Sequence, residues 1–311
     1  MAWDEADEEV RELQNELNRT GYKFTRDFIL KSCLTILDKG ASYDVNKFRD
    51  ESTRQDIMSN WQRISNSIKA VKDYLYEKTL IRSDKALPSY LCLIPIIYFR
   101  YHYEEAWSAT RGIDEYILRS LLTGAFSGNP DNLINQCTKA IDIKQAFLVK
   151  DIYEVIRENG RNLEVTKETV LNQHYESKNI HLIFNLWYKD FNYHPSFESS
   201  LPELDHIFPQ SALKSVKLPN PSSGVLNILK YKWWDRNQIA NLMLLTQAEN
   251  SFGGKCDTLP EKWFANKSDS YLELHLIPWD KKLWKLENFP LFVEERRKLI
   301  EQKFKHLILR N

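Results

Sequence analysis

The sequence predicts a mainly α protein of the α+β class, in which a helical bundle precedes a smaller domain built on two short strands and a helix. Over the first 190 residues apolar side chains recur every three or four positions, which is the period of amphipathic helices. The apolar runs at 204–208 and 241–245 are short enough for strands. Between these regions a stretch rich in proline and serine, 194–202, interrupts the helical pattern. We therefore expect two domains, residues 1–195 and 196–311.

The first domain contains seven segments with helical patterns. Pro88 precedes a nearly unbroken apolar segment, which we expect to be the central buried helix of the bundle. Asn159-Gly160 is a typical helix stop. The expected helices are 4–18, 28–37, 53–76, 89–103, 113–122, 130–140 and 143–157. The aromatic run 180–193 fits a helix or a strand, and its periodicity does not separate the two.

The second domain carries an insertion between its two strands, residues 211–237, with the sequence Pro-Asn-Pro-Ser-Ser-Gly at its middle. The insertion is rich in lysine and contains Trp233-Trp234. Basic residues beside aromatic ones suit the binding of a nucleic-acid backbone or the stacking of a base. The tryptophans also fit as plugs that pack the insertion onto the core, and we expect this simpler role. An amphipathic helix over 289–309 closes the domain.

The charge balance does not by itself indicate a nucleic-acid-binding protein. The 43 Lys and Arg residues equal the 43 Asp and Glu residues, so the net charge is zero. From residue 201 to 311, 17 basic residues stand against 13 acidic ones. This mild excess fits phosphate binding without establishing it.

Cysteine usage and hydropathy predict a cytoplasmic protein without membrane contact. The four cysteines, Cys33, Cys92, Cys137 and Cys256, form no Cys-x-x-Cys pair, as expected for free thiols in a reducing compartment. Residues 1–16 are acidic and polar, unlike a signal peptide. The most apolar run, 90–99, is too short to span a bilayer.

The histidines before residue 200 are expected to be ordinary structural residues. His102, His174, His181 and His194 have no carboxylate or cysteine at metal-ligand spacing. No glycine-rich phosphate loop or internal repeat is visible in this part of the sequence. The candidate chemistry lies between residues 204 and 255.

This stretch contains Asp205-His206, Pro209, Asn241 and Asn250. Hydrolysis of a phosphodiester at neutral pH needs a base, and histidine suits this role because its ordinary pKa is about 6.5. A hard cation such as Mg²⁺, which needs few oxygen ligands from the protein and leaves positions for water and phosphate, stabilises the leaving oxygen. Neighbours in a strand point to opposite faces, so Asp205 and His206 converge on one phosphate only if the strand breaks there. Pro209 makes a break just beyond the pair expected.

The two halves of the stretch resemble the HNH nuclease motif, a ββα-metal finger in which a hairpin and a helix hold one divalent cation. The resemblance implies that His206 is the general base and that Asp205 and Asn250 bind Mg²⁺ or Mn²⁺. It makes Asn241 the residue that holds the loop and orients the imidazole.

Zinc is not expected in this finger. Many HNH proteins have a zinc-binding Cys-x-x-Cys at positions that are Thr246 and Glu249 in this sequence. Packing must then hold the finger together.

The order of the segments resembles more narrowly the C-terminal part of GmrSD-like restriction endonucleases, phage-defence proteins that pair a ParB-like nucleotide-dependent domain with an HNH domain. The likeness is strong after about residue 200 and loose before it. It is carried by 204–210, 239–255 with 259–260, 275–278, 284 and 292–299, and more loosely by 26–31 and 87–99. The Asp-Gly-Gln-Gln-Arg signature of the ParB-like domain is absent. That domain is therefore expected in a longer chain or as a separate subunit.

The resemblance thus implies a metal-dependent endonuclease that cuts DNA one strand at a time and restricts foreign or modified DNA. Lys214, Lys232, Arg236 and Lys255 are candidate contacts to the DNA backbone. Two alternatives stay open: a nucleic-acid-binding or assembly module with a vestigial finger, and an RNase that uses the same site. Because one finger cuts one strand, a double-strand break needs a homo-oligomer or successive nicks.

Overall fold

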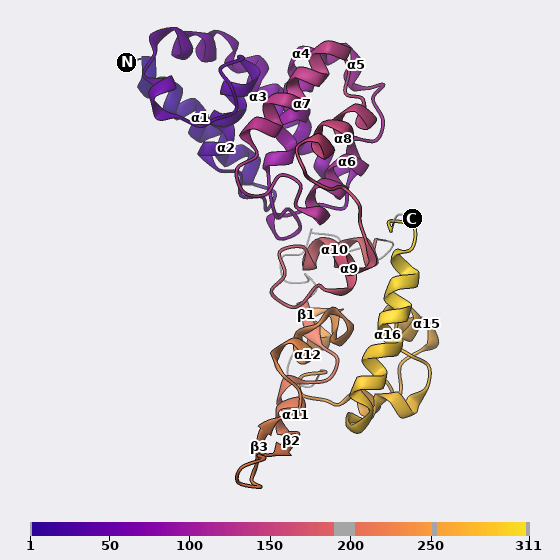
Figure 1. Ribbon diagram of the computed structural model, residues 1–311. Helices are drawn as coiled ribbons and strands as arrows, with labels where there is room; N and C mark the ends of the chain where they lie inside the picture. The colour runs from indigo at the N-terminus through magenta and orange to yellow at the C-terminus, as the bar shows by residue number, and fades with distance from the viewer. Residues whose placement is uncertain (1, 190–202, 251–253, 309–311) are drawn as a thin grey trace. The chain divides into compact units, whose positions relative to one another are not determined.

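The computed structural model describes residues 2–189, 203–250 and 254–308, which belong to two compact units, 1–164 and 165–311 (Figure 1). The boundary expected between residues 195 and 196 lies outside the described residues. The segment from 165 to 189 belongs to the second unit. Within that unit Arg297 Nη1 donates to the Leu171 carbonyl (3.0 Å), and Trp187 Nε1 donates to the Leu274 carbonyl (3.0 Å).

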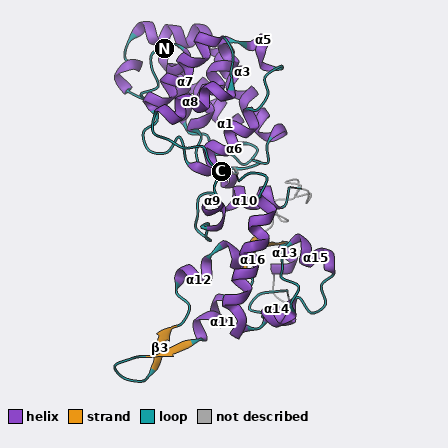
Figure 2. Ribbon diagram, turned by 45° about the vertical axis from the view of Figure 1, so that its right-hand side comes forward, coloured by secondary structure: helices purple, strands orange, loops and turns teal. Residues whose placement is uncertain are grey.

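All regular elements described in the first unit are helices (Figure 2). They are α1 (Ala2–Asn18), α2 (Arg26–Ile36), η1 (Val45–Phe48), α3 (Glu51–Lys78), η2 (Asp84–Ala86), η3 (Leu91–Leu93), α4 (Ile94–His102), α5 (Glu104–Trp107), α6 (Ile113–Thr123), α7 (Asp131–Lys144) and α8 (Val149–Glu158). The largely apolar α4 packs against α2, α3 and α7. Each amphipathic helix buries one face in the shared core, and this confirms the expected bundle with a central apolar helix.

Two helices of this unit begin later than their sequence pattern predicts. α4 begins at Ile94 because Pro95, which lacks an amide hydrogen, is favoured in the first turn. α7 ends where Gln145 takes a left-handed φ of 51°, and α8 starts only at Val149. The prediction of one helix over 143–157 is therefore wrong.

The second unit mixes helices with two small antiparallel sheets. Its elements are α9 (Lys167–Leu171), α10 (Ile180–Trp187), β1 (Glu203–His206), α11 (Gln210–Ser215), β2 (Lys217–Pro219), β3 (Leu226–Leu229), α12 (Trp233–Asn237), η5 (Ile239–Asn241), β4 (Leu242–Leu245), α13 (Gln247–Asn250), α14 (Pro260–Trp263), α15 (Asp269–Leu274), η6 (Lys281–Trp284), η7 (Leu286–Asn288) and α16 (Phe289–Phe304). The ambiguous run 180–193 is helical over α10, and its end lies outside the described residues. No helix in the described ranges is long and apolar enough to cross a membrane.

The strands β1 and β4 pair across the insertion that separates them in the sequence. They are antiparallel, with Asp205 opposite Met243 and His206 opposite Leu242. All four residues of β4 are buried, so this strand fixes the pair to the core. α13 follows β4 almost directly, which gives the order strand, strand, helix.

A buried arginine of α16 holds the segment in front of β4. The guanidinium of Arg296 donates to five backbone carbonyls at 2.7–3.3 Å. The acceptors are the carbonyls of Ile239, Ala240, Leu242, His275 and Leu276. Because three of these carbonyls flank Asn241, α16 fixes the backbone on both sides of that residue.

Candidate active site

His206 ends β1, and its imidazole is held by side chains of the insertion. Nε2 lies 2.9 Å from Oδ1 of Asn237. Asn237 Nδ2 donates to the Trp233 carbonyl (2.9 Å), and this bond turns the amide so that its oxygen faces the histidine. Since that oxygen can only accept, Nε2 carries the imidazole proton and Nδ1 keeps its lone pair. Gln210 Nε2 donates to the same oxygen at 3.3 Å from the start of α11.

Burial lowers the pKa of His206 below its ordinary value. The hydrogen bond to Asn237 and the charge of Asp205 act in the opposite direction, and the charges of Lys255 and Arg236 lower the pKa further. The imidazole is therefore neutral at pH 7. A neutral imidazole is the state that a general base requires.

Asp205 is paired with a buried ammonium group. Nζ of Lys255 lies 2.6 Å from Asp205 Oδ2 and also donates to the backbone carbonyl of His206. The Lys255 side chain is fully buried, and this burial lowers its pKa although Asp205 offsets part of the effect. Lys255 thus lies inside the site, and not on the exposed surface that a contact to the DNA backbone would need.

Asn241 holds the loop that follows β1. Its Oδ1 accepts from the Phe208 amide (2.8 Å), and its Nδ2 donates to the carbonyls of Phe208 (3.2 Å) and Arg236 (2.8 Å). The side chain is fully buried. The residue bonded to the imidazole is Asn237, four residues earlier at the end of α12, which sequence reasoning placed in the insertion without a role. Its one signal in the sequence is that it lies four positions before Asn241.

Asn250, at the end of α13, donates through Nδ2 to the Glu203 carboxylate, which leaves the amide oxygen as its cation-binding atom. Glu203 and Asp205 share one face of β1 because they are two residues apart. Carboxylate and amide oxygens are the ligands that a hard divalent ion prefers, and the Lys255 ammonium already contacts one of the two Asp205 oxygens. Within the described ranges no group of three or more His, Cys, Asp and Glu side chains could hold a metal. Asp205 and Asn250 would therefore leave most of the coordination shell to water and phosphate.

Most of the second unit is similar in sequence to a known family. Residues 160–300 match the family model described as GmrSD restriction endonucleases, C-terminal domain. Over these residues, somewhat less than half of the chain, the protein is similar to that family. The match takes in β1, the insertion, β4 and α13, and so includes every residue of the site. No curated protein matches the chain.

In the second unit hydrogen bonds join Thr246 and Glu249, the two positions where many HNH proteins carry Cys-x-x-Cys. Glu249 Oε2 accepts from the amide (3.2 Å) and the hydroxyl (3.1 Å) of Thr246. Its Oε1 lies 3.3 Å from Lys267 Nζ, which is 3.9 Å from the ring centroid of Trp263 and 4.4 Å from that of Tyr271. This polar cluster ties the start of α13 to the segment around α14 and α15.

The segment between α9 and α10 also borders the His206 imidazole. The Tyr175 ring stacks on His206, with the centroids 5.1 Å apart and the planes 17° from parallel. The Tyr175 amide donates to the Asn237 carbonyl (2.9 Å), which fixes the segment to α12. Sequence reasoning missed Tyr175, because no spacing rule links it to a histidine more than thirty residues away.

The two adjacent tryptophans do not plug the insertion onto the core. Trp234 is 66% exposed, and Trp233 is half-buried. Both rings lie edge-on to the His174 imidazole, with centroids 5.1 and 5.0 Å away. Trp234 is thus an exposed aromatic side chain close to the site.

The residues expected to contact the DNA backbone fall into two groups, exposed and buried. Lys214 and Lys232 are exposed. Arg236 is buried, with Nη1 donating to the Tyr231 carbonyl (2.7 Å). Like Lys255, it lies inside the domain near His206, so these two cations act on the histidine through their charge.

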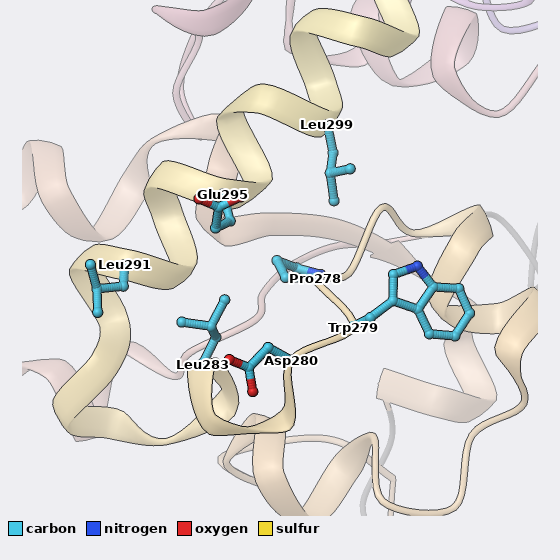
Figure 3. Close-up of a pocket in the computed structure, with 7 residues that line it drawn as sticks. All are labelled: Pro278, Trp279, Asp280, Leu283, Leu291, Glu295 and Leu299. Carbon is cyan, nitrogen blue, oxygen red and sulfur yellow. The ribbon is translucent and has the colours of Figure 1, made fainter.

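A surface depression elsewhere in the unit shares none of these residues (Figure 3). It lies between α16 and the segment after α15, and leucines line it together with the exposed Trp279. Asp280 and Glu295 add two carboxylates. Because carboxylates repel phosphate, the depression does not suit a nucleic-acid backbone.

Proposed function

We propose that the second unit is a metal-dependent endonuclease that hydrolyses phosphodiester bonds of DNA, with His206 as its general base. The main support for this proposal is the protonation state of the His206 imidazole. Burial keeps the ring neutral, Asn237 fixes the proton on Nε2, and Nδ1 is left to accept a proton. The family match supports a nucleic-acid substrate.

The reaction begins when Nδ1 of His206 takes a proton from a water molecule. The water oxygen attacks phosphorus in line with the 3′ oxygen, and the bond between phosphorus and that oxygen breaks. The departing oxygen takes a proton from solvent, so the products carry a 5′ phosphate and a 3′ hydroxyl. Asn237 stabilises the imidazolium because its oxygen accepts a hydrogen bond from Nε2. Asn241 keeps the loop after β1 in place while the charge changes.

Asp205 and Asn250 are the residues that would hold Mg²⁺ or Mn²⁺. When bound, such a cation stabilises the negative charge on the departing oxygen. Lys255 places a second positive charge beside Asp205, and burial keeps that ammonium in position.

Nicking of supercoiled plasmid DNA tests the role of His206. The wild-type chain should nick the plasmid with Mg²⁺ or Mn²⁺ and should stop when a chelator is added. His206→Ala should be slower by about 10²- to 10⁴-fold, the usual contribution of a general base. His306→Ala, which changes an exposed histidine of the same unit, is the matched control and should cut at the wild-type rate. Equal rates for the wild type and His206→Ala would remove this residue from the mechanism.

Metal binding separates the nuclease from a vestigial finger. Calorimetric titration with Mn²⁺ should show a site that is lost in Asp205→Ala and kept in Asp269→Ala, an exposed acid of the same unit. The vestigial module predicts no such difference. The plasmid assay repeated on RNA distinguishes a DNase from an RNase, because both would depend on His206.

A further inference from the structure

A two-stranded ribbon, formed by β2, β3 and the loop between them, projects from the second unit away from its core (Figures 1 and 2). The strands are antiparallel, with Lys217 opposite Leu229 and Leu218 opposite Ile228. The loop is held by its own bonds, since the amides of Asn220 and Gly224 donate to the carbonyls of Val225 and Asn220, both at 2.8 Å. The tip is therefore preformed.

The ribbon exposes apolar side chains that no core requires. Leu218 is 43% exposed, Val225 57% and Leu226 65%. Two strands alone are marginally stable in water, and aliphatic side chains on both strands at the tip add nothing to the core. Adjacent exposed aliphatic groups on a projecting element are typical of an interaction surface.

The charge around the ribbon indicates what it binds. Between Ser211 and Trp234 the chain has four lysines and no carboxylate, although the whole protein is neutral. The four are Lys214, Lys217, Lys230 and Lys232, and all are exposed. None of them forms an ion pair with another residue that the structure describes. A surface that combines unpaired ammonium groups with aliphatic groups complements a polyanion that also offers apolar edges.

Both ends of the ribbon are connected to the catalytic histidine. The helix before β2 begins with Gln210, and the helix after β3 ends with Asn237. Gln210 donates a hydrogen bond to Oδ1 of Asn237, the same atom that faces His206. Whatever the ribbon binds is therefore held at a fixed position relative to the imidazole.

We propose that the ribbon inserts into a groove of duplex DNA and so positions the scissile strand at His206. The major groove of B-DNA is about 12 Å wide and admits a two-stranded ribbon. Lys217 and Lys230 contact phosphates on either side of the groove, and Leu218, Val225 and Leu226 contact sugars and base edges inside it. This inference rests on the proposed function, because DNA is its ligand.

Binding of a labelled DNA duplex, followed by fluorescence anisotropy over a range of salt concentrations, tests the ribbon. The measurement uses the full chain carrying His206→Ala, with a chelator present, so that no cutting occurs. Lys217→Gln with Lys230→Gln should weaken binding about tenfold or more at about 0.1 M salt. The slope of log affinity against log salt should fall by about 2, because two phosphate contacts are lost. The matched control is Lys262→Gln with Lys285→Gln, two exposed lysines of the same unit, and it should bind like the parent.

A second variant separates groove insertion from charge alone. Leu218→Ser with Leu226→Ser should weaken binding several-fold and leave the salt slope unchanged, since apolar contacts release no counterions. These are exposed positions, so the variants keep the fold. Unchanged affinity in both ribbon variants would overturn the inference, as would a serine variant that changes only the oligomeric state. DNA binding is measured without cutting, so the two proposals can fail separately. If the ribbon variants weaken DNA binding but the wild-type chain never nicks DNA, the proposed function is wrong and the inference about the ribbon stands.

Discussion

The two units bury different kinds of side chain. Among the described residues of the first unit, Arg119 is the one buried charged side chain in a core of apolar stripes. In the second unit Arg236, Lys255 and Arg296 are all buried, and each donates to a backbone carbonyl near the β1–β4 pair. Burial of a cation destabilises a fold unless the charge is compensated. The core of the first unit is thus largely apolar, whereas the core of the second unit contains buried cations, two of them near His206.

Burial has opposite chemical results in the two units. It raises the pKa of Cys33, Cys92 and Cys137 in the first unit to about 12, so these thiols keep their protons and stay inert. It lowers the pKa of His206 in the second unit, so the imidazole loses its proton and becomes a base. A neutral thiol is unreactive, whereas a neutral imidazole can accept a proton. The same desolvation therefore keeps the thiols inert and leaves the imidazole able to accept a proton.

The largest expected loss of stability comes from Arg296→Leu. The change removes a buried guanidinium that donates to five backbone carbonyls, and it should lower the free energy of unfolding of the second unit by about 3 to 5 kcal/mol. Urea unfolding measures this. Arg119→Leu is the matched change in the first unit, and it should cost about 1 kcal/mol because it removes one ion pair with the exposed Glu115 and one weak bond. Equal costs would contradict the contrast between the two cores.

Mild acid should destabilise the second unit through His275. Burial lowers the pKa of this residue to about 3. Between that value and the ordinary pKa of about 6.5, the unfolded chain binds a proton that the folded chain does not, so stability falls as pH falls. From pH 7 to pH 5 this residue should cost on the order of 2 kcal/mol.

Urea unfolding at the two pH values, wild type beside His275→Gln, isolates this effect. The wild type should lose on the order of 2 kcal/mol more than the variant over the interval. Parallel losses in the two proteins would show that other groups cause the acid sensitivity.

Asn237→Ala should slow nicking by about 10- to 100-fold, because the imidazole loses the bond that orients it, although the base itself remains. The bond to Asn237 raises the pKa of His206, so its loss should move the acidic limb of the pH–rate profile to lower pH. Gln238→Ala, next in the chain, removes an amide that bonds to the Asp235 carbonyl and should leave the profile unchanged. A slower variant with an unmoved acidic limb would mean that Asn237 acts only on the fold.

The smallest expected effect is on the ribbon. Val225→Ser changes an exposed side chain, so the free energy of unfolding should shift by less than about 0.5 kcal/mol. Thermal unfolding of the full chain measures it. A loss above about 1 kcal/mol would show that the tip packs against the protein and is not available to a ligand.

Sequence reasoning predicts what depends on local pattern and misses what depends on distant chain segments meeting. The helix stripes, the two strands of the finger and the loop-holding position of Asn241 follow from period, length and motif spacing. The contact of Tyr175 with His206 does not, because it requires the segment between α9 and α10 to reach α12 and the end of β1. The sequence also does not reveal that Lys255 is buried. A lysine that follows the two glycines after a helix has the same local pattern whether its side chain is exposed or buried.

The role of His206 as a general base depends on which nitrogen of its imidazole carries the proton. Long-range ¹⁵N–¹H correlation spectra of the imidazole nitrogens, assigned with His206→Ala, report which nitrogen carries the proton. At pH 6.5 to 7 we predict a neutral ring with the proton on Nε2 and a bare Nδ1, and in Asn237→Ala this preference should weaken. A proton on Nδ1, or an imidazolium at pH 7, would contradict the account of His206 as an oriented, neutral base.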